Sequence, residues 1–220
     1  MTSSTVDVVD LGLAQLASAE ETIEAIRRGE MVVVMDDEDR ENEGDIIVAA
    51  DFATPAVINF MITYGRGLVC VALTPERAAE LNLPPMVVRN TDHHATAFTV
   101  SVDGTPSHGV TTGISAFDRA KTIELLLHGT EADFSRPGHI FPLVARPGGV
   151  LERPGHTEGS VDLARLAGLN PAGVIVEIIR PDGQMARRAD LEMFALRHGL
   201  ALSTIERLRE YRAANEPVMA

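Results

Sequence analysis

Short apolar runs that alternate with helical segments constrain the fold of this chain most strongly. Each run spans only five to seven residues, and several are rich in Val and Ile, a length and composition typical of buried β-strands. A chain with several such runs must pair them in a sheet and cover that sheet with helices. The runs occupy residues 31–35, 45–50, 68–73, 140–145 and 173–179, with a shorter one near Leu202.

Signals for helix starts and stops lie between these runs. Ser18 and Glu21 form a capping-box pattern, and the Thr-Pro pairs at 54–55 and 74–75 place a proline in the first helical turn. Residues 97–102 alternate between apolar and polar, which predicts a strand leading to a hairpin at Asp103-Gly104. The predicted helices are 18–28, 54–64, one from 74, 115–127, 158–167, 189–197 and a last one that runs through Tyr211.

Helices and strands follow one another without strict β–α–β alternation, which favours the α+β class over a doubly wound sheet. We expect a single domain over residues 1–220, built as a mixed sheet with flanking helices. About residues 1–17 and 213–220 are expected to be loose ends.

Charge and cysteine content exclude several classes of partner. The formal net charge of −13, from 32 acidic and 19 basic side chains, argues against binding to nucleic acid or to a membrane surface, because both require clustered Lys and Arg. Cys70 is the only cysteine, so the chain can form neither an intramolecular disulfide nor a cysteine zinc cluster. The first residues lack the features of a signal peptide, and no apolar run approaches the roughly 18 residues of a membrane span. We therefore expect a cytoplasmic protein.

The acidic segment 36–45, DDEDRENEGD, carries seven carboxylates and one arginine between two predicted strands. A charge run is usually a solvated loop. Here the apolar strands place the loop at the edge of the core, where repulsion among carboxylates is costly unless a cation or a ligand relieves it. Oxygen-rich clusters suit a hard cation such as magnesium or manganese, and Gly44 suggests a specific backbone turn.

A second segment, RPGHTEGS at 153–160, leads into a predicted helix. The free N–H groups of a first helical turn favour an anion, and Arg153 could add a bidentate phosphate contact. Thr157 could cap the helix or donate to the anion, and His156 could bind a metal ion. Each feature alone has an ordinary structural explanation, so an anion pocket and a plain helix start both remain open.

Two single residues are candidate acid–base groups. His139 precedes a predicted strand and could transfer protons near neutral pH, although a single histidine at a strand end is more often structural. Glu177 lies inside the apolar run GVIVEII, where a carboxylate is costly unless it is paired or has a function. The GVTTG segment at 109–113 could line an anion pocket, whereas the adjacent His93-His94 pair is expected to bind no metal.

At these segments the sequence resembles the 3,4-dihydroxy-2-butanone-4-phosphate synthase family of riboflavin biosynthesis. The resemblance extends from about Ser18 to Tyr211 and depends on five motifs in family-like order, which together are far more specific than any one alone. The motifs are DDEDRENEGD at 36–45, GVTTGISAFDRA at 109–120, RPGHIFPL at 136–143, GGVLERPGHTE at 148–158 and PAGVIVEI at 171–178. Arg66 and Ala95 depart from many relatives, which carry Ser or Thr and Gly there.

The resemblance implies an enzyme, a lyase that cleaves a carbon–carbon bond. It would convert D-ribulose 5-phosphate to L-3,4-dihydroxy-2-butanone 4-phosphate and formate, as a homodimer, with Mg²⁺ or Mn²⁺ and no organic cofactor. Some relatives carry a GTP cyclohydrolase II domain whose zinc is bound by cysteines, so the single cysteine leads us to expect the monofunctional form. Imidazole is an uncommon ligand of Mg²⁺. Magnesium is therefore expected from the resemblance, with Mn²⁺ able to substitute.

The resemblance also implies roles for individual residues. Glu41 and His156 would bind the metal, and His139, Glu177 and Asp45 would be catalytic, although which group takes the first proton stays open. The substrate-binding residues would be Arg40, Glu41, Asp45, Arg153, Pro154, Gly155, His156, Thr157 and Glu177.

Two other functions remain as alternatives. A metal-dependent sugar-phosphate isomerase or aldolase could use the same residues, but it would release no formate. A catalytically inactive binding protein is disfavoured because Glu41, His139, His156 and Glu177 are all present.

Overall fold

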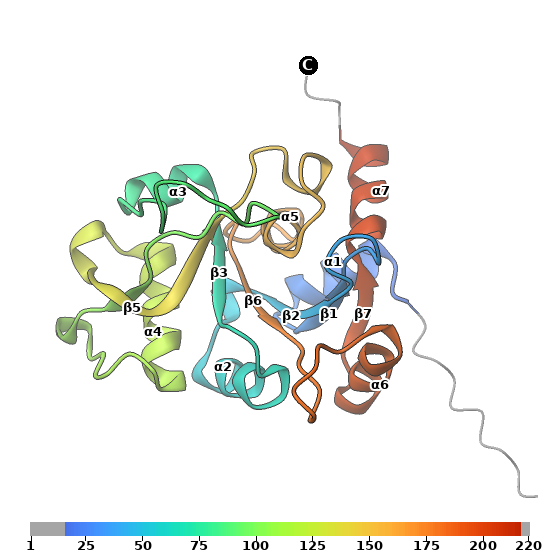
Figure 1. Cartoon of the computed structure of the whole chain (residues 1–220), viewed down its shortest axis with the longest axis horizontal. Coiled ribbons are helices and arrows are strands. Elements are labelled where there is room, and N and C mark those ends of the chain that lie inside the picture. The colour runs from blue at the N-terminus through green and yellow to red at the C-terminus, as the bar shows by residue number, and fades with distance from the viewer. Residues whose placement is uncertain (1–15, 217–220) are drawn as a thin grey trace, which may run out of the picture.

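A mixed sheet forms the centre of the molecule in the computed structural model, which describes residues 16–216. Within these residues seven strands follow the order β4-β5-β3-β6-β2-β1-β7 (Figure 1). The strands are β1 Val32–Met35, β2 Gly44–Ala49, β3 Cys70–Leu73, β4 Val102–Gly104, β5 Phe134–Val144, β6 Gly173–Glu177 and β7 Ala201–Thr204.

Both strand orientations occur in this sheet. The pairs β1–β7 and β3–β5 are parallel, whereas β1–β2, β2–β6, β3–β6 and β4–β5 are antiparallel. The long strand β5 pairs with β4 through its first half and with β3 from Phe141 onwards. The expected α+β class, with one mixed sheet, is confirmed.

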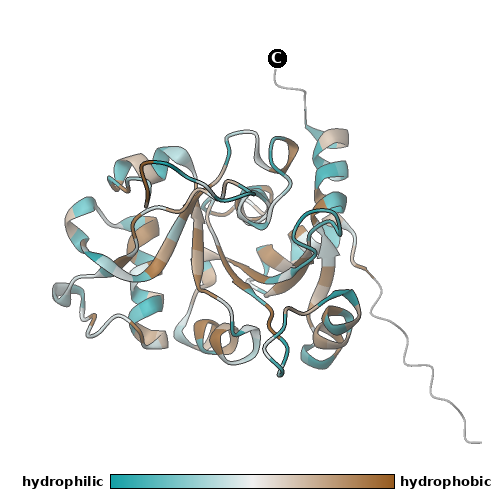
Figure 2. Cartoon of the chain, in the orientation of Figure 1, coloured by the Kyte–Doolittle hydropathy of each residue, from teal (hydrophilic) through white to brown (hydrophobic). Residues whose placement is uncertain are grey.

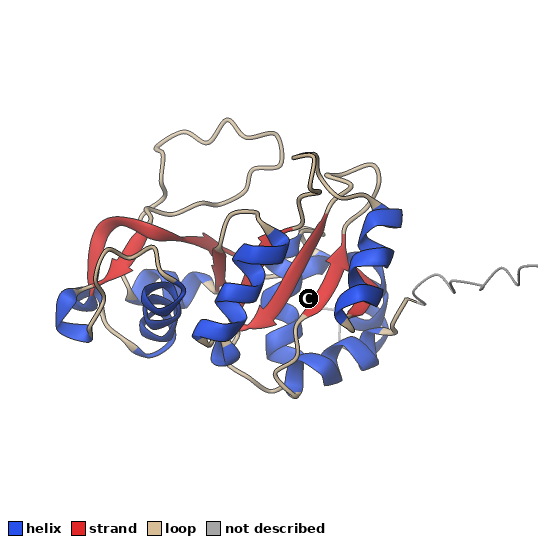
Figure 3. Cartoon of the chain, turned by 90° about the horizontal axis from the view of Figure 1, so that it is seen from below, coloured by secondary structure: helices blue, strands red, loops and turns tan. Residues whose placement is uncertain are grey.

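Helices cover both faces of the sheet (Figure 3). Most start at a serine or threonine whose side chain accepts from a first-turn N–H, as at Ser18, Thr54, Thr74, Ser115 and Thr204. The helices are α1 Ala19–Arg27, α2 Pro55–Phe60, α3 Pro75–Glu80, α4 Ala116–His128, α5 His156–Leu166, α6 Arg188–His198 and α7 Ile205–Asn215, with a π-helical turn, η2, at Met61–Gly65.

Two apolar cores lie on the two sides of the sheet, because successive side chains of a strand point to opposite faces. Val33 of β1 packs in the core that also includes residues of α2, α4 and α6. Its neighbours Val32 and Val34 pack in the other core, with residues of α1, α5 and α7. The strands are accordingly the most continuously hydrophobic stretches of the chain (Figure 2). Among residues 16–216, no helix has the length and apolar character that crossing a bilayer requires.

The register of β2 and β6 places two carboxylates side by side. Asp45 is paired directly with Glu177, and both follow the alternation that points Ile47 and Ile175 into the core under α5. Helix α5 packs on β2, β3 and β6 and begins at His156. The start of this helix and the two acidic strand ends therefore meet on one face of the sheet.

Several local predictions were wrong. Asp103 and Gly104 lie within β4 and not in a hairpin turn. The glycine at 104 leaves room for neighbouring side chains, since a Cβ there would press on Leu125 and Val110. Strand β5 begins at Phe134 instead of 140, and α5 begins two residues earlier than predicted.

The ends of the described chain are also better anchored than expected. Helix α7 continues to Asn215, beyond the predicted end of the ordered chain at 212. The Ala17 N–H donates to the carbonyl of Leu202 at 2.7 Å. The remaining predicted loose ends, 1–15 and 217–220, lie outside the described residues.

Candidate active site

A cavity of about 200 Å³ opens between the acidic segment and the first turn of α5. Its walls combine the ends of β2, β3 and β6 with the loop that precedes β4. The lining residues are Arg40, Glu41, Glu43, Asp45, Cys70, Thr96, Phe98, Leu143, Arg153, His156, Thr157, Ile175 and Glu177.

Asp36 folds the acidic loop around its own carboxylate. One oxygen accepts from the backbone N–H of Glu43 at 2.8 Å, and the other accepts from the Glu41 N–H at 3.1 Å and from Arg40 at 2.8 Å. The left-handed turn of this loop is at Asn42, with φ of 56°, and not at Gly44. The Cβ that Gly44 lacks would collide with Leu191. The solvated-loop alternative therefore describes only the exposed residues 37–39.

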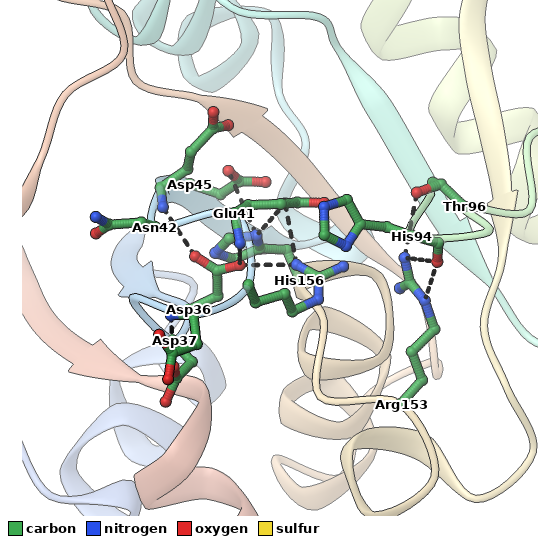
Figure 4. Close-up of polar contacts among 12 residues, drawn as sticks. Asp36, Asp37, Glu41, Asn42, Asp45, His94, Thr96, Arg153 and His156 are labelled. Carbon is green, nitrogen blue, oxygen red and sulfur yellow. Dashed lines mark hydrogen bonds and ion pairs between the residues drawn. The ribbon is translucent and has the colours of Figure 1, made fainter. Parts of the chain in front are cut away.

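Glu41, Asp45 and His156 form a compact cluster at the cavity wall (Figure 4). The Nδ1 atom of His156 lies 3.8 Å from an oxygen of Glu41 and 3.8 Å from an oxygen of Asp45. Two atoms that bind one Mg²⁺ at roughly 2.1 Å each can be at most about 4.2 Å apart. The spacing therefore allows one ion to contact His156 together with either of the two carboxylates.

The orientation of the His156 ring follows from one hydrogen bond. Its Nε2 lies 3.1 Å from the carbonyl oxygen of Val34. Because a carbonyl can only accept, Nε2 carries the hydrogen, and Nδ1 is the atom that faces the carboxylates. A backbone carbonyl that holds the distal nitrogen in this way is a common arrangement for metal-binding histidines.

The electrostatics of the cluster fit a cation. Burial raises the pKa of Asp45 to about 7, and one Asp45 oxygen is buried with no hydrogen-bond partner among the described residues. Burial also acts to lower the pKa of His156, but Asp45 and Glu41 outweigh it and raise that pKa to about 9. The hydrogen bond to His156 lowers the pKa of Glu41 to about 2. These residues form a candidate site for a divalent metal ion.

Asp36 is the third residue of a group, with Glu41 and His156, whose ligand atoms lie within 4.8 Å of one another. Sequence reasoning did not single it out. Both of its oxygens already accept hydrogen bonds within the acidic loop. We therefore assign Asp36 to holding the loop that presents Glu41.

The first turn of α5 faces the same cavity. Its N-cap is Gly155, which offers no side chain to the free N–H groups, and Thr157 is buried in the turn and does not cap it. A Cβ at Gly155 would lie 2.5 Å from an Arg153 nitrogen and 2.9 Å from an Arg40 nitrogen. Two guanidinium groups thus pack over the start of this helix, an arrangement that suits an anion.

Arg153 is more engaged than the sequence suggested. It donates to Glu158 at 2.6 Å, to Thr96 at 3.1 Å and twice to the carbonyl of His94 at 3.2 Å (Figure 4). These contacts use four of the five guanidinium N–H groups. Arg153 therefore connects the loop before β4 to α5, with one N–H left for a ligand.

Glu177 lies on the opposite side of the cavity from α5. Its carboxylate accepts the Leu68 N–H at 2.7 Å, and Gly67 packs so closely against it that any side chain there would collide. Cys70 lies nearby in β3, and burial, together with Glu177 and Asp45, raises the pKa of its thiol. Sequence reasoning did not predict that Cys70, Glu43, Thr96 and Phe98 line the cavity. Of these four, Glu43 could have been found, because it lies within the acidic motif.

Three predicted site residues, His139, Pro154 and Gly155, are not among those that line this cavity. His139 does not line it; its side chain is 46% exposed, and its Nδ1 lies 2.7 Å from a carboxylate oxygen of Asp103. Pro154 lines a neighbouring cavity of about 380 Å³, which shares Arg40 with the first. Within one chain the structure thus brings together every predicted site residue except His139 and Pro154, with Gly155 beneath the two guanidinium groups.

Comparison with known families identifies the family to which this chain belongs. Residues 20–211 match the sequence pattern of the family described as 3,4-dihydroxy-2-butanone 4-phosphate synthase. The chain belongs to this family. The resemblance carried by the five sequence motifs is thereby confirmed.

Members of this synthase family differ in length. The riboflavin biosynthesis protein RibBA of Aquifex aeolicus is 59% identical over 204 residues, which cover 92% of this chain and 50% of that protein. The synthase of Agrobacterium fabrum is 59% identical over 198 residues, which cover 89% of this chain and 92% of that protein. The chain spans about half the length of several curated relatives that it matches, including the RibBA protein.

Solved structures of the synthase family share the fold. A crystal structure of a synthase in complex with two magnesium ions is 44% identical, with a TM-score of 0.87 over 91% of this chain and 99% of that one. The two-domain RibBX of A. baumannii is 54% identical, also with a TM-score of 0.87, over 91% of this chain and 59% of that one.

Proposed function

We propose that this chain converts D-ribulose 5-phosphate to L-3,4-dihydroxy-2-butanone 4-phosphate and formate in riboflavin biosynthesis. The observation that carries the proposal is the cluster of Glu41, Asp45 and His156 in one cavity with the uncapped start of α5. A sugar phosphate needs both halves of that cavity: oxygen-binding groups for the reacting end and an anion site for the other end. The family membership supports the same assignment.

The α5 end of the cavity would bind the substrate phosphate. The N–H groups of Thr157 and its neighbours lie in the first helical turn, where they have no partner within the helix. Arg40 and the remaining N–H of Arg153 add positive charge over the same turn. Binding energy from the phosphate would orient the reacting carbons against the acidic groups.

Glu41 and His156 would bind Mg²⁺, and Mn²⁺ would substitute. The ion would supply Lewis-acid stabilisation for negative charge that develops on the substrate oxygens. A relative solved in complex with two magnesium ions supports the choice of magnesium. The proposal needs no organic cofactor.

Asp45 and Glu177 are the proton-transfer groups within the cavity. They are adjacent in register across β2 and β6, and they approach a bound sugar from the sheet side. Burial places the pKa of Asp45 at about 7, so this carboxyl can exchange a proton near neutral pH. The raised thiol pKa keeps Cys70 protonated, so Cys70 lines the cavity and does not act as a nucleophile.

A catalytic role for His139 requires a second copy of the chain. His139 is held by Asp103, and Gly113 packs against the same carboxylate, beside the exposed apolar residues Ile114 and Phe117. An exposed apolar pair of this kind is a natural contact surface. We therefore propose a homodimer in which one protomer brings His139 to the cavity of its partner.

The test is a formate assay with ribulose 5-phosphate, run before and after chelation. We expect formate release that stops with chelator and returns with Mg²⁺. Conversion to another pentose phosphate without formate would favour a metal-dependent isomerase instead. Undiminished formate release after complete metal removal would contradict the metal site.

A further inference from the structure

Another cavity lies on the opposite face of the sheet from the candidate active site, next to the core formed with α2 and α6. It has a volume of about 490 Å³, within the roughly 300–1,000 Å³ range of small-molecule sites. Its walls are η2, the hairpin that follows β6 and the outer side of α6, which lie together at the lower edge of the molecule in Figure 1. We call it the α6 groove.

Aromatic rings form one side of the α6 groove. The ring of His198 lies 4.7 Å from Tyr64 and 4.5 Å from Phe194, measured between centroids. Burial, with the nearby Arg197 charge, lowers the pKa of His198, so this ring is neutral at pH 7. Tyr64 remains 47% exposed and Met193 48% exposed, so part of this surface is open to a ligand. A flat, apolar ring is the shape that such a surface accepts.

Arginines form the other side. Arg66, Arg180 and Arg197 line the groove, opposed by the single carboxylate of Asp190, in a chain whose net charge is −13. Within residues 16–216, Arg180 pairs with Asp182 and Asp190, whereas no ion pair involves Arg66 or Arg197. Two exposed guanidinium groups are thus available for an anion.

The backbone of Arg66 is in an unusual conformation at the edge of this groove. It ends the π-helical turn η2 with φ of 76°, in the left-handed region that arginine rarely adopts. Its guanidinium donates to the carbonyl of Arg180 at 2.8 Å, which holds it over the groove.

We propose that the α6 groove binds a planar aromatic phosphate, the ring stacked on the exposed side of Tyr64, which His198 supports from behind, and the phosphate held by Arg66 and Arg197. Flavin mononucleotide and adenosine monophosphate both carry this chemistry. The groove lies across the sheet from the candidate active site and shares no lining residue with the sugar-phosphate cavity.

The experiment is a titration of the full chain with flavin mononucleotide, whose fluorescence is quenched when its ring stacks, and a parallel calorimetric titration with adenosine monophosphate. We expect saturable binding of at least one of the two, which also distinguishes the two sources. Riboflavin and inorganic phosphate, which each lack one half of the ligand, should bind about tenfold more weakly or worse. Absence of binding by both nucleotides would overturn the proposal, as would equal binding of riboflavin.

Matched variants locate the site. Arg66→Gln and Arg197→Gln should each weaken binding about tenfold, because each removes one charge-assisted contact to the phosphate. Arg28→Gln makes the same change of charge at the end of α1, outside the groove, and should leave binding unchanged. Excess ribulose 5-phosphate should not displace the nucleotide. Displacement, or equal binding by Arg197→Gln and the wild type, would show that the nucleotide binds elsewhere.

Discussion

The burial and hydrogen bonding of single residues in this site depend on their surroundings more than on their residue type. Asp45 and Glu177 are both acidic residues at strand ends, yet Asp45 is buried with an unpaired oxygen, while Glu177 is half-buried and accepts a backbone N–H. His156 and His139 differ in the same way. One is buried among carboxylates, and the other is exposed beside Asp103.

At the residue scale, Glu177→Gln should abolish catalysis and leave the fold intact. Glutamine keeps an oxygen that can accept the Leu68 N–H, but it cannot transfer a proton. We expect formate release to fall about 100- to 10,000-fold, the usual effect of losing a general acid or base, with thermal unfolding unchanged. Turnover at the wild-type rate would show that Glu177 is not catalytic.

Gly155→Ala tests the packing of the two guanidinium groups over α5. The added Cβ would meet the ends of the Arg153 and Arg40 side chains, which must then leave the anion site and give up part of their contacts to Glu158 and Asp36. We expect a rise in KM for ribulose 5-phosphate of about tenfold, together with a lower unfolding temperature. Gly159→Ala is the matched control in the same helix, because its Cβ would meet only the end of Ile205. An equal effect of the two substitutions on KM would contradict this account.

At the scale of elements, the C-terminal helix secures the segment that leads into α5. Arg212 of α7 donates to the carbonyl of Gly148 at 2.9 Å and to Asp162 of α5 at 2.7 Å. Asp162 in turn accepts the Val150 N–H at 2.8 Å. Both ionic side chains are almost fully buried, so the helix end, the loop and α5 are held as one unit.

Arg212→Met should therefore destabilise the chain strongly. Removing Arg212 leaves the buried Asp162 carboxylate with only the Val150 N–H and the partly exposed Arg165 as partners. Loss of one partner of a buried ion pair costs up to about 3–5 kcal/mol of unfolding free energy. Urea denaturation measures the loss, and adding Asp162→Asn should recover part of it. Arg165→Met is the control, since Arg165 is 43% exposed and its pair with Asp162 should contribute at most about 1 kcal/mol. Equal losses of unfolding free energy in the two arginine variants would contradict a stabilising role for the buried Arg212–Asp162 pair.

At the scale of the whole molecule, the proposed catalytic role of His139 depends on a second copy of the chain. Its strand position lies beside β4, outside the cavity of its own chain. Isologous contact between two copies would place each His139 against the other copy, because such an interface uses the same surface on both protomers.

Mixed dimers test this arrangement. His139→Ala and Glu41→Gln should each be inactive alone, since each removes one half of both sites. When the two variants are unfolded and refolded together, half of the dimers are mixed and contain one intact site, so about a quarter of wild-type formate release should return. The same protein refolded as separate variants is the control. No recovery on mixing, with dimers present, would place His139 in its own protomer's site or outside catalysis.

The elements of the fold were largely readable from local sequence. Apolar runs became β1, β2, β3, β6 and β7, and capping residues set the starts of most helices, because both signals act over a few neighbouring residues. Errors arose where a distant partner decided the outcome. From the sequence we predicted turns at Gly104 and Gly44. In the structure, Gly104 instead leaves room for the Leu125 side chain, and Gly44 leaves room for Leu191.

The sequence by itself determined which residues supply the charged groups of the cavity, since three of the five motifs, at 36–45, 148–158 and 171–178, hold all of its acidic, imidazole and guanidinium groups. Only the tertiary structure decided which of them meet. Asp45 faces Glu177 because β2 and β6 pair in one register, and Cys70 joins them because β3 lies next to β6. His139 is left outside because its end of β5 pairs with β4 instead. Strand order and register depend on packing across the whole sheet, which no local pattern specifies.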